Sequence, residues 1–531
     1  MKKNYRLGAF VTTVTLVAGL FSYPTSSIAN DSREVKGLGE LPGVQLNTNR
    51  HYYNEIYRPQ FHFTPEQNWM NDPNGLVYYK GEYHLFYQYN PKGNTWGNMS
   101  WGHAVSKDLL HWEHLDVALK PDELGMIFSG SMVVDKHNTS GLFKKGSGGL
   151  VAIFTHAGDT QQQSIAYSED NGRTWKKYKG NPVIKNPGIA DFRDPKVFWH
   201  EDTKQWVMVV AAGNRIQIYS SSNLKEWEYK SEFGEGMGAH GGVWECPDLF
   251  EIPVDGNPNH TKWVLGVDIN PGAVAGGSGG QYFIGDFDGK TFKTKQEPKE
   301  INWVDYGKDF YASQSWDNMN QRRVWIAWMN NWNYAEKIPT SPWRSAMSIP
   351  REVGLKKTDN GEILLTQKPI HEIKKIRDKK FEFKNRKIQS ENIKIPKISG
   401  QTQEIVAEFE LGSADEFGFY VRKGHGEFTK VGYDAKKREL FVDRRKSGRT
   451  DFSEDFAGVY TAPLDSEDNK IKMHIFIDRS SVEVFGNDGE RVLTNQIFPD
   501  PSSDGLEIYS KDGDVKITSL DVYKLGSTWD K

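Results

Sequence analysis

Short apolar runs, separated by clusters of Gly, Asn, Asp and Pro, recur along most of this chain. Between about residues 60 and 350 they include 82–89, 150–156, 205–212, 262–269 and 323–329. The runs are rich in β-branched and aromatic residues, as β-strands are, and the 3.6-residue period of amphipathic helices is hard to find there. The pattern predicts an all-β protein.

A second element recurs between these runs, in the form of a polar turn that ends on an aromatic residue. The four copies end at Trp112, Trp175, Trp227 and Phe292, at intervals of roughly 50 to 65 residues. A repeat of this length, with several strands in each unit, is typical of β-propeller blades. Four copies, together with the strands left over at 310–350, predict a five-bladed β-propeller over residues 57–354.

The rest of the chain has a different organisation. Residues 355–380 are charged and are expected to form a linker with one short strand pair. Alternating strands return at 404–411, 416–422, 470–478, 481–485 and 515–523, with turns of the NDG and KDG type. Strands at this spacing predict a C-terminal antiparallel β-sandwich over residues 381–531.

The N-terminus resembles an export signal. Lys2, Lys3 and Arg6 form a basic region, 7–21 is an apolar run, and Ser27-Ile28-Ala29 offers small residues to a signal peptidase. We expect a signal peptide at 1–29 that is cleaved after Ala29, a secreted protein without a membrane span, and an N-terminal extension at 30–56.

Charge and cysteine content narrow the classes of function. The chain has 67 Lys and Arg against 70 Asp and Glu, for a net charge of −3, without a long run of either sign. This is a poor electrostatic match for nucleic acid or an anionic membrane. The only cysteine is Cys246, so an intramolecular disulfide is impossible.

Three short stretches place an acid shortly before a proline that leads into an apolar strand; in the third stretch the acid is one residue further from its proline. They are Asn71-Asp72-Pro73, Arg193-Asp194-Pro195 and Glu245-Cys246-Pro247. A single acid before proline is usually only a turn residue. Three similar acids in a repeat favour a shared site instead, because equivalent positions of propeller blades converge. Converging carboxylates suit glycoside hydrolysis, in which one is an ionised nucleophile and another a protonated acid.

Four motifs in order carry a family resemblance: NWMNDPNG at 68–75, FSGS at 128–131, FRDP at 192–195 and WECPDLF at 244–250. From about residue 57 to the C-terminus the chain resembles glycoside hydrolase family 32, the fructan hydrolases and invertases, and especially its secreted exo-acting fructan β-fructosidases (levanases). The resemblance implies a five-bladed propeller followed by a β-sandwich. It also implies release of fructose from levan, inulin or sucrose through a covalent fructosyl–enzyme intermediate, without a cofactor.

The resemblance also implies residue roles. Asp72 would be the nucleophile, Glu245 the general acid/base and Asp194 the stabiliser of the transition state. The residues implied around the terminal fructose are Trp69, Asn71, Gln88, Trp96, Phe128, Ser129, Arg193 and Trp343.

Two neighbours of the acids carry expectations of their own. Arg193 should keep the carboxylate of Asp194 ionised. Cys246, next to Glu245 along a strand, should point away from it as a small buried apolar group.

Other functions fit parts of the sequence. The stretch SEDNGRTW at 168–175 matches the Asp-box of sialidases, but converging acids would repel their anionic substrates. A non-catalytic sugar-binding propeller would not need the acid pair. An endo-acting enzyme or a fructosyltransferase would use the same three acids.

No metal site is expected, because His62, His84, His103 and His111 lack zinc-ligand spacing. The oligomeric state is left open.

Overall fold

The computed structural model describes residues 52–319 and 322–529, and it is built almost entirely of β-strands. The all-β prediction is confirmed. The predicted signal peptide at 1–29 and most of the extension at 30–56 lie outside the described residues. Among those that are described, no helix is long and apolar enough to cross a membrane.

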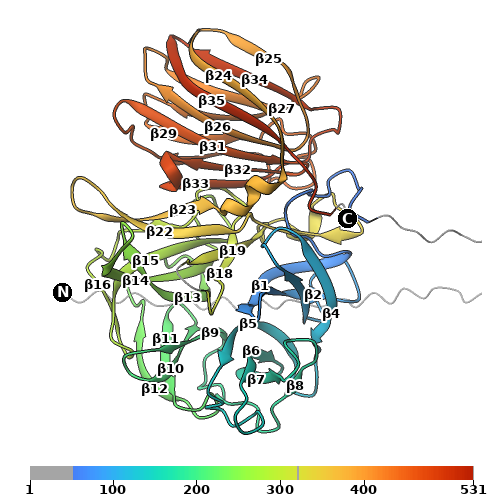
Figure 1. Ribbon diagram of the computed structural model, residues 1–531, viewed down its shortest axis with the longest axis vertical. Helices are drawn as coiled ribbons and strands as arrows, with labels where there is room; N and C mark the ends of the chain where they lie inside the picture. The colour runs from blue at the N-terminus through green and yellow to red at the C-terminus, as the bar shows by residue number, and fades with distance from the viewer. Residues whose placement is uncertain (1–51, 320–321, 530–531) are drawn as a thin grey trace, which may run out of the picture. The chain divides into compact units, whose positions relative to one another are not determined.

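The first part of the chain forms four successive antiparallel meanders, each of four strands (Figure 1). The first holds β1 (Asn68–Tyr79), β2 (Glu82–Asn90), β3 (Ser100–Ser106) and β4 (Trp112–Leu119). The second holds β5 (Met126–Asp135), β6 (Gly149–Ala157), β7 (Gln161–Ser168) and β8 (Lys176–Lys177). The third holds β9 (Phe192–His200), β10 (Gln205–Ala212), β11 (Ile216–Ser221) and β12 (Glu228–Phe233). The fourth holds β13 (Val243–Val254), β14 (Asn257–Asn270), β15 (Gly279–Phe287) and β16 (Phe292–Thr294).

The repeated polar turn lies before the last strand of each meander and has the same construction in all four. A side-chain oxygen of Asp108, Asp170, Asn223 or Asp288 accepts hydrogen bonds from two backbone amides that follow it. In the first three turns the Trp indole N–H donates to the carbonyl oxygen three residues earlier. The repeat seen in the sequence is therefore a structural repeat, fixed by an Asx-type turn.

A fifth group of strands follows the four meanders. It holds β18 (Tyr311–Ser315), β19 (Val324–Met329), β21 (Ala346–Met347), β22 (Arg351–Lys357) and β23 (Ile363–Pro369), and hydrogen bonds join it to the fourth meander through β22 and β13. Two short strands pair elsewhere: β17 (Asn302–Trp303) with β15, and β20 (Trp343–Arg344) in parallel with β1. β22 and β23 pair with each other, but β22 begins at Arg351, before the linker expected at 355–380, and both strands belong to this fifth group.

The first strands of these five groups lie together. β1 contacts β5, β5 contacts β9, β9 contacts β13, β13 contacts β18, and β18 contacts β1. Figure 1 shows β1, β5, β9, β13 and β18 toward the middle of this part of the molecule, with β4, β8, β12 and β16 outside them. Residues on the first strands are thereby brought close together although they are far apart in sequence.

The C-terminal part contains two six-stranded antiparallel sheets that share one apolar core, with residues such as Ile405, Phe419, Val431 and Ile475 fully buried between them. One sheet holds β24 (Arg377–Gln389), β26 (Gln403–Glu410), β31 (Lys470–Asp478), β32 (Ser481–Gly486), β33 (Arg491–Gln496) and β35 (Asp514–Leu525). The other holds β25 (Asn392–Ser399), β27 (Glu416–Lys423), β28 (Thr429–Asp434), β29 (Glu439–Asp443), β30 (Val459–Pro463) and β34 (Gly505–Lys511). Three short 3₁₀ helices complete the description: η1 (Ala335–Lys337), η2 (His371–Ile376) and η3 (Asn487–Gly489).

Buried ionic groups connect the N-terminal strands to the C-terminal sheets. His62 lies between two carboxylates, with Nδ1 2.8 Å from Asp478 and Nε2 2.8 Å from Glu483. Glu483 also pairs with Arg351, at 2.5 Å, and Arg351 pairs with Asp305 at 3.0 Å. Burial lowers the pKa of His62, but the hydrogen bonds to both carboxylates outweigh burial and raise the pKa to about 9. The imidazole is therefore charged at neutral pH.

This cluster predicts a loss of stability at alkaline pH. Because the folded pKa of His62 lies above its unfolded value of about 6.5, the stabilisation is fully present below that value and is lost as pH rises through about 9. The shift corresponds to about 3 kcal/mol of unfolding free energy. Denaturant unfolding at pH 7 and pH 10 should show this loss in the wild type and a clearly smaller one in His62→Gln. His111→Gln, at an exposed histidine, is the control, and equal pH dependence in wild type and His62→Gln would contradict the assignment.

Candidate functional site

The three acids singled out in the sequence lie on first strands: Asp72 on β1, Asp194 on β9 and Glu245 on β13. In each case the strand pairing is interrupted at the acid by a register shift. The adjacent prolines have no N–H to donate, which favours such an interruption. β5 and β18 are interrupted in the same way, near Ser129 and Ala312. All five first strands therefore carry a bulge where they approach the site, and a bulge re-aims the side chains beside it.

Asp72 is held by hydrogen bonds from its neighbours. Ser129 Oγ donates to Oδ2 at 2.6 Å, and Asn71 Nδ2 donates to Oδ1 at 3.0 Å. Burial raises the pKa of Asp72 above its ordinary value, Glu245 raises it further, and the Ser129 and Asn71 hydrogen bonds oppose the rise. These two donors favour the ionised carboxylate in a site that otherwise disfavours charge.

Asp194 is almost fully buried and has an unusual backbone conformation, with φ of 66°. The backbone N–H of Cys246 donates to its Oδ2 at 3.0 Å. Burial is the main reason that the pKa of Asp194 rises to about 7; Arg193 lowers it, whereas Glu245 and Asp72 raise it. Arg193 thus favours the ionised form of this carboxylate, as expected, but it does not offset the other contributions. Burial and two like charges outweigh one guanidinium whose Nε is 3.9 Å away.

Glu245 receives the stronger contact from Arg193. The guanidinium donates to Oε1 from Nη2 at 2.7 Å and from Nε at 3.1 Å, and it also pairs with Asp191 at 2.5 Å. The phenol of Tyr311 donates to the other oxygen, Oε2, of Glu245. Both carboxylate oxygens of Glu245 are thus positioned by charged or polar donors from other strands.

Cys246 lies beside two of the three acids. Its backbone lies in the left-handed region, with φ of 48°, so the simple alternation of strand side chains does not apply. The thiol lies 3.5 Å from Oδ2 of Asp72 and 3.6 Å from Oδ2 of Asp194. Cys246 is buried as predicted, and its side chain packs between Asp72 and Asp194.

Cys246 therefore contacts Asp72 and Asp194, and Arg193 contacts Asp194 and Glu245. Through these two shared neighbours the structure gathers all three carboxylates at one place. A group of this kind has the parts for general acid and nucleophilic chemistry. It holds carboxylates in different hydrogen-bonding environments, one stabilised as an anion by Ser129 and another reached by Arg193 and Tyr311.

The structure places several of the other predicted site residues near Asp72. Asn71 and Ser129 contact it directly. Gln88 is buried and donates to Asn74 Oδ1 at 2.8 Å. Phe128, next to Ser129, packs edge-on against Trp96, which is 40% exposed. An exposed aromatic side chain beside a carboxylate site is available to a ligand.

Trp69 and Trp343 are placed differently. Trp69 is fully buried; its indole N–H donates to Asn71 Oδ1 at 2.7 Å and its ring stacks on Trp332. Trp343 is 2% exposed, and the guanidinium of Arg58 lies over its ring at 3.8 Å. Trp69 thus supports Asn71 from behind, and Trp343 packs in the protein interior. Their contact with a substrate stays a prediction.

Three further residues at the site were missed from the sequence: the thiol of Cys246 as a neighbour of two acids, Tyr311, and the half-buried Trp332. Only Cys246 has a usable signal, since it lies inside an acid–Pro motif. Tyr311 and Trp332 lie beyond residue 300, where no motif resembles the first three. In the described parts of the chain, 52–319 and 322–529, no cluster of His, Cys, Asp or Glu could hold a metal ion.

Comparisons with known proteins show which proteins this chain is similar to. The Glycosyl hydrolases family 32 N-terminal domain matches residues 62–369, and the family's C-terminal domain matches 372–524. Levanase from Bacillus subtilis (strain 168) is 59% identical over 487 residues, which are 90% of this chain and 72% of that protein. The crystal structure of exo-inulinase from Aspergillus awamori superposes with a TM-score of 0.85 at 43% identity, over 90% of this chain and 100% of that one. β-Fructofuranosidase from Schwanniomyces occidentalis, complexed with fructosyl-erythritol, gives 0.83 at 35% identity, over 90% and 99%.

The buried thiol allows a direct test of the site's geometry. Burial is the main cause that raises the pKa of Cys246, and Asp194 and Asp72 add to the rise. The native protein should therefore not react with a thiol-specific chromogenic reagent at pH 8, while the unfolded chain should release one equivalent. The rate of reaction measured with and without denaturant checks this. Rapid labelling of the native protein would show that Cys246 does not lie between the two acids.

Proposed function

The chain belongs to glycosyl hydrolase family 32, and we propose that it is a secreted, exo-acting enzyme that hydrolyses β-fructans and sucrose to release fructose. The observation that carries this proposal is the meeting of Asp72, Asp194 and Glu245 through Arg193 and Cys246. Relatives described as levanase, exo-inulinase and β-fructofuranosidase share most of the length of the chain.

In the proposed mechanism Asp72 is the nucleophile. Its carboxylate attacks the anomeric carbon of the terminal fructose, and the bond to the leaving oxygen breaks as a fructosyl ester forms. The hydrogen bonds from Ser129 and Asn71 support this role because they stabilise the ionised form that must attack. Water then cleaves the ester, so the configuration at the anomeric carbon is retained.

Glu245 is proposed to be the acid and then the base. It gives a proton to the leaving oxygen and later removes one from the attacking water. Arg193 holds one oxygen of this carboxyl group and Tyr311 the other, so the group is oriented before substrate arrives. Asp194, which lies close to Asp72 and Glu245, is proposed to bind fructose hydroxyls and to favour the positive charge that develops on the sugar ring.

The fold that supports this site is proposed to be a five-bladed propeller that begins near residue 57, followed by a β-sandwich that begins with β24. The boundaries expected from the sequence, 57–354, 355–380 and 381–531, are moved, because β22 and β23 pair within the fifth group of strands and β24 begins at Arg377. The contacts among β1, β5, β9, β13 and β18 run from each strand to the next and return to the first. The pairing of β20 with β1 joins the end of this region to its beginning. The two C-terminal sheets share one core, as the sheets of a sandwich do.

Three parts of the proposal rest on weaker support. Secretion is supported by the basic and apolar residues at 1–29 and by relatives described as extracellular. Exo action is supported by the exo-inulinase relatives. The names of the same relatives also support hydrolysis rather than fructosyl transfer. The three acids do not decide between the two reactions, because they would serve water and sugar acceptors alike.

Two substitutions separate the proposed roles of the acids. Asp72→Asn keeps the shape and removes the attacking charge, so turnover on every substrate should fall by about 10⁴-fold or more. Glu245→Gln should lose much less on an aryl fructoside with a good leaving group than on sucrose, because such a group needs little protonation. Steady-state kinetics on both substrates measure this. Wild-type turnover in Asp72→Asn, or equal losses on both substrates in Glu245→Gln, would contradict the roles.

The products released from levan and inulin test the mode of attack. An exo-acting enzyme should yield fructose alone from the earliest time points, because it removes one terminal unit at each encounter. Chromatography of a time course reads this directly. A ladder of oligosaccharides would show endo action, and polymer growth from sucrose would show a fructosyltransferase.

A further inference from the structure

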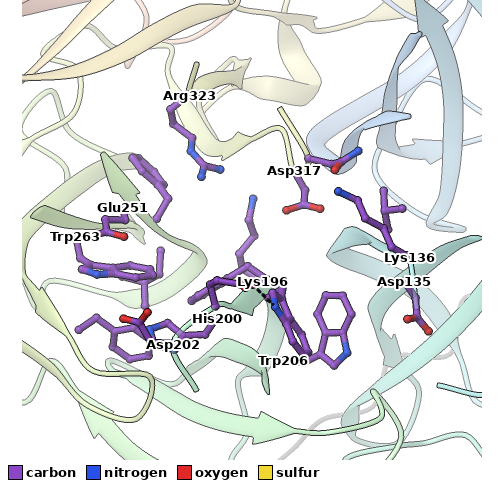
Figure 2. Close-up of a pocket in the computed structure, with 18 of the residues that line it drawn as sticks. Asp135, Lys136, Lys196, His200, Asp202, Trp206, Glu251, Trp263, Asp317 and Arg323 are labelled. Carbon is purple, nitrogen blue, oxygen red and sulfur yellow. Dashed lines mark hydrogen bonds between the residues drawn. The ribbon is translucent and has the colours of Figure 1, made fainter. Parts of the chain in front are cut away.

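A second pocket, with a volume of about 740 Å³, lies at the other end of the strands that form the three-acid site (Figure 2). Asp135 on β5, Lys196 on β9 and Glu251 on β13 line it, and Asp317 follows β18. Glu251 lies about six positions beyond Glu245, roughly 20 Å along an extended strand. None of the three acids lines the pocket, although the same strands build both and Lys196 follows Asp194 by only two positions.

The interior of the pocket contains charged groups that converge on one space, of which Lys196 is paired and Arg323 is not. Figure 2 shows Arg323, Asp317 and Lys196 directed toward the same space. Lys196 is neutralised by Asp248 at 3.1 Å. Within the described chain, Arg323 has no carboxylate within salt-bridge distance: its Nη1 donates to Ser315 Oγ and to the carbonyl oxygen of Trp316, at 3.3 and 3.4 Å. Arg323 and Asp317 thus supply a donor and an acceptor to anything that enters.

Aromatic side chains form the walls around these groups. Trp206 and Trp263 come from β10 and β14, and Figure 2 shows them on different sides of the pocket. Trp263 is half-buried and packs against Phe198 and His200. Aromatic faces combined with a few convergent polar groups are typical of sites for polyhydroxylated ligands, whose C–H faces are apolar and whose hydroxyls need partners.

The charges indicate a neutral ligand. One interior cation is already paired with Asp248, and the other lies opposite Asp317. Among the exposed charged residues that line the pocket, one cation, Lys136, is outnumbered by four carboxylates, Glu201, Asp202, Glu251 and Asp286, which would oppose the entry of an anion such as phosphate. A neutral sugar chain needs no unpaired cation in the interior and is not repelled by the exposed carboxylates.

We propose that this pocket is a second carbohydrate site, which binds a short segment of β-fructan while the three-acid site cleaves a chain end. The choice of fructan rests on the proposed function, whereas a neutral sugar as ligand class rests on the pocket alone. By holding the polymer, the second site would raise the local concentration of chain ends near the enzyme. It would not affect sucrose, which is too small to reach both sites.

Calorimetry on Asp72→Asn, which cannot turn over, tests the proposal with a β-2,6-linked fructan oligosaccharide as probe. Two binding sites per chain are expected. Addition of Asp317→Asn, nearly isosteric, or of Trp263→Ala should weaken the second site at least tenfold and leave the first unchanged. Asp451→Asn, at an 81% exposed aspartate outside the pocket, is the matched control.

Kinetics supply a second readout in the otherwise wild-type enzyme. Asp317→Asn should raise KM for levan several-fold and leave kcat and KM for sucrose unchanged, which also shows that the variant is folded. A single binding site in Asp72→Asn, two intact sites in both double variants, or binding of inorganic phosphate in place of the sugar would overturn the proposal. Failure of the proposed function looks different, because the wild type would then release no fructose.

Discussion

The structure depends on holding three carboxylates in one largely buried place. Burial and mutual repulsion raise the pKa values of Asp72 and Asp194, and such a group is stable only if nearby donors compensate. The compensation is divided among the strands. β5 supplies the Ser129 hydroxyl, β13 the Cys246 backbone amide and β9 the Arg193 guanidinium. Each acid is thus stabilised by a strand other than its own, which ties the site's charge state to the packing of several sheets.

The bulges explain how regular sheets produce so irregular a site. A regular strand would direct alternate side chains to opposite faces, and neighbouring acids and donors could not meet. Register shifts at Asp72, Asp194 and Glu245, two of them with positive φ at or beside the acid, turn these side chains toward one another. β5 and β9 are regular further along, where their residues line the second pocket.

The repeated turns and the three acids could be predicted from the sequence because they depend on residue types at short, fixed spacings. The turns that end at Trp112, Trp175 and Trp227 need an Asx residue and an aromatic residue at fixed spacing, so they can be recognised in the sequence alone. The acids were found because proline marks each bulge.

Contacts that depend on the bulged backbone could not be predicted from the sequence. The position of the Cys246 thiol between Asp72 and Asp194 was not predicted, because a left-handed residue cannot be read from strand periodicity. The raised pKa of Asp194 was not predicted, because the sequence shows its neighbour Arg193 but not the burial that outweighs it. Tyr311 lies on a strand without a motif, and its contact with Glu245 depends on how the fifth group of strands packs against the fourth.

The central claim is that Asp72 becomes covalently bonded to fructose during turnover. Glu245→Gln should slow the removal of the sugar, so that acid quenching after brief exposure to an activated aryl fructoside traps the intermediate. Mass spectrometry of the digested protein should then find one fructosyl unit on the peptide that contains Asp72. A fructosyl unit on Asp194, or no modified peptide under conditions in which product is released in a burst, would contradict the account.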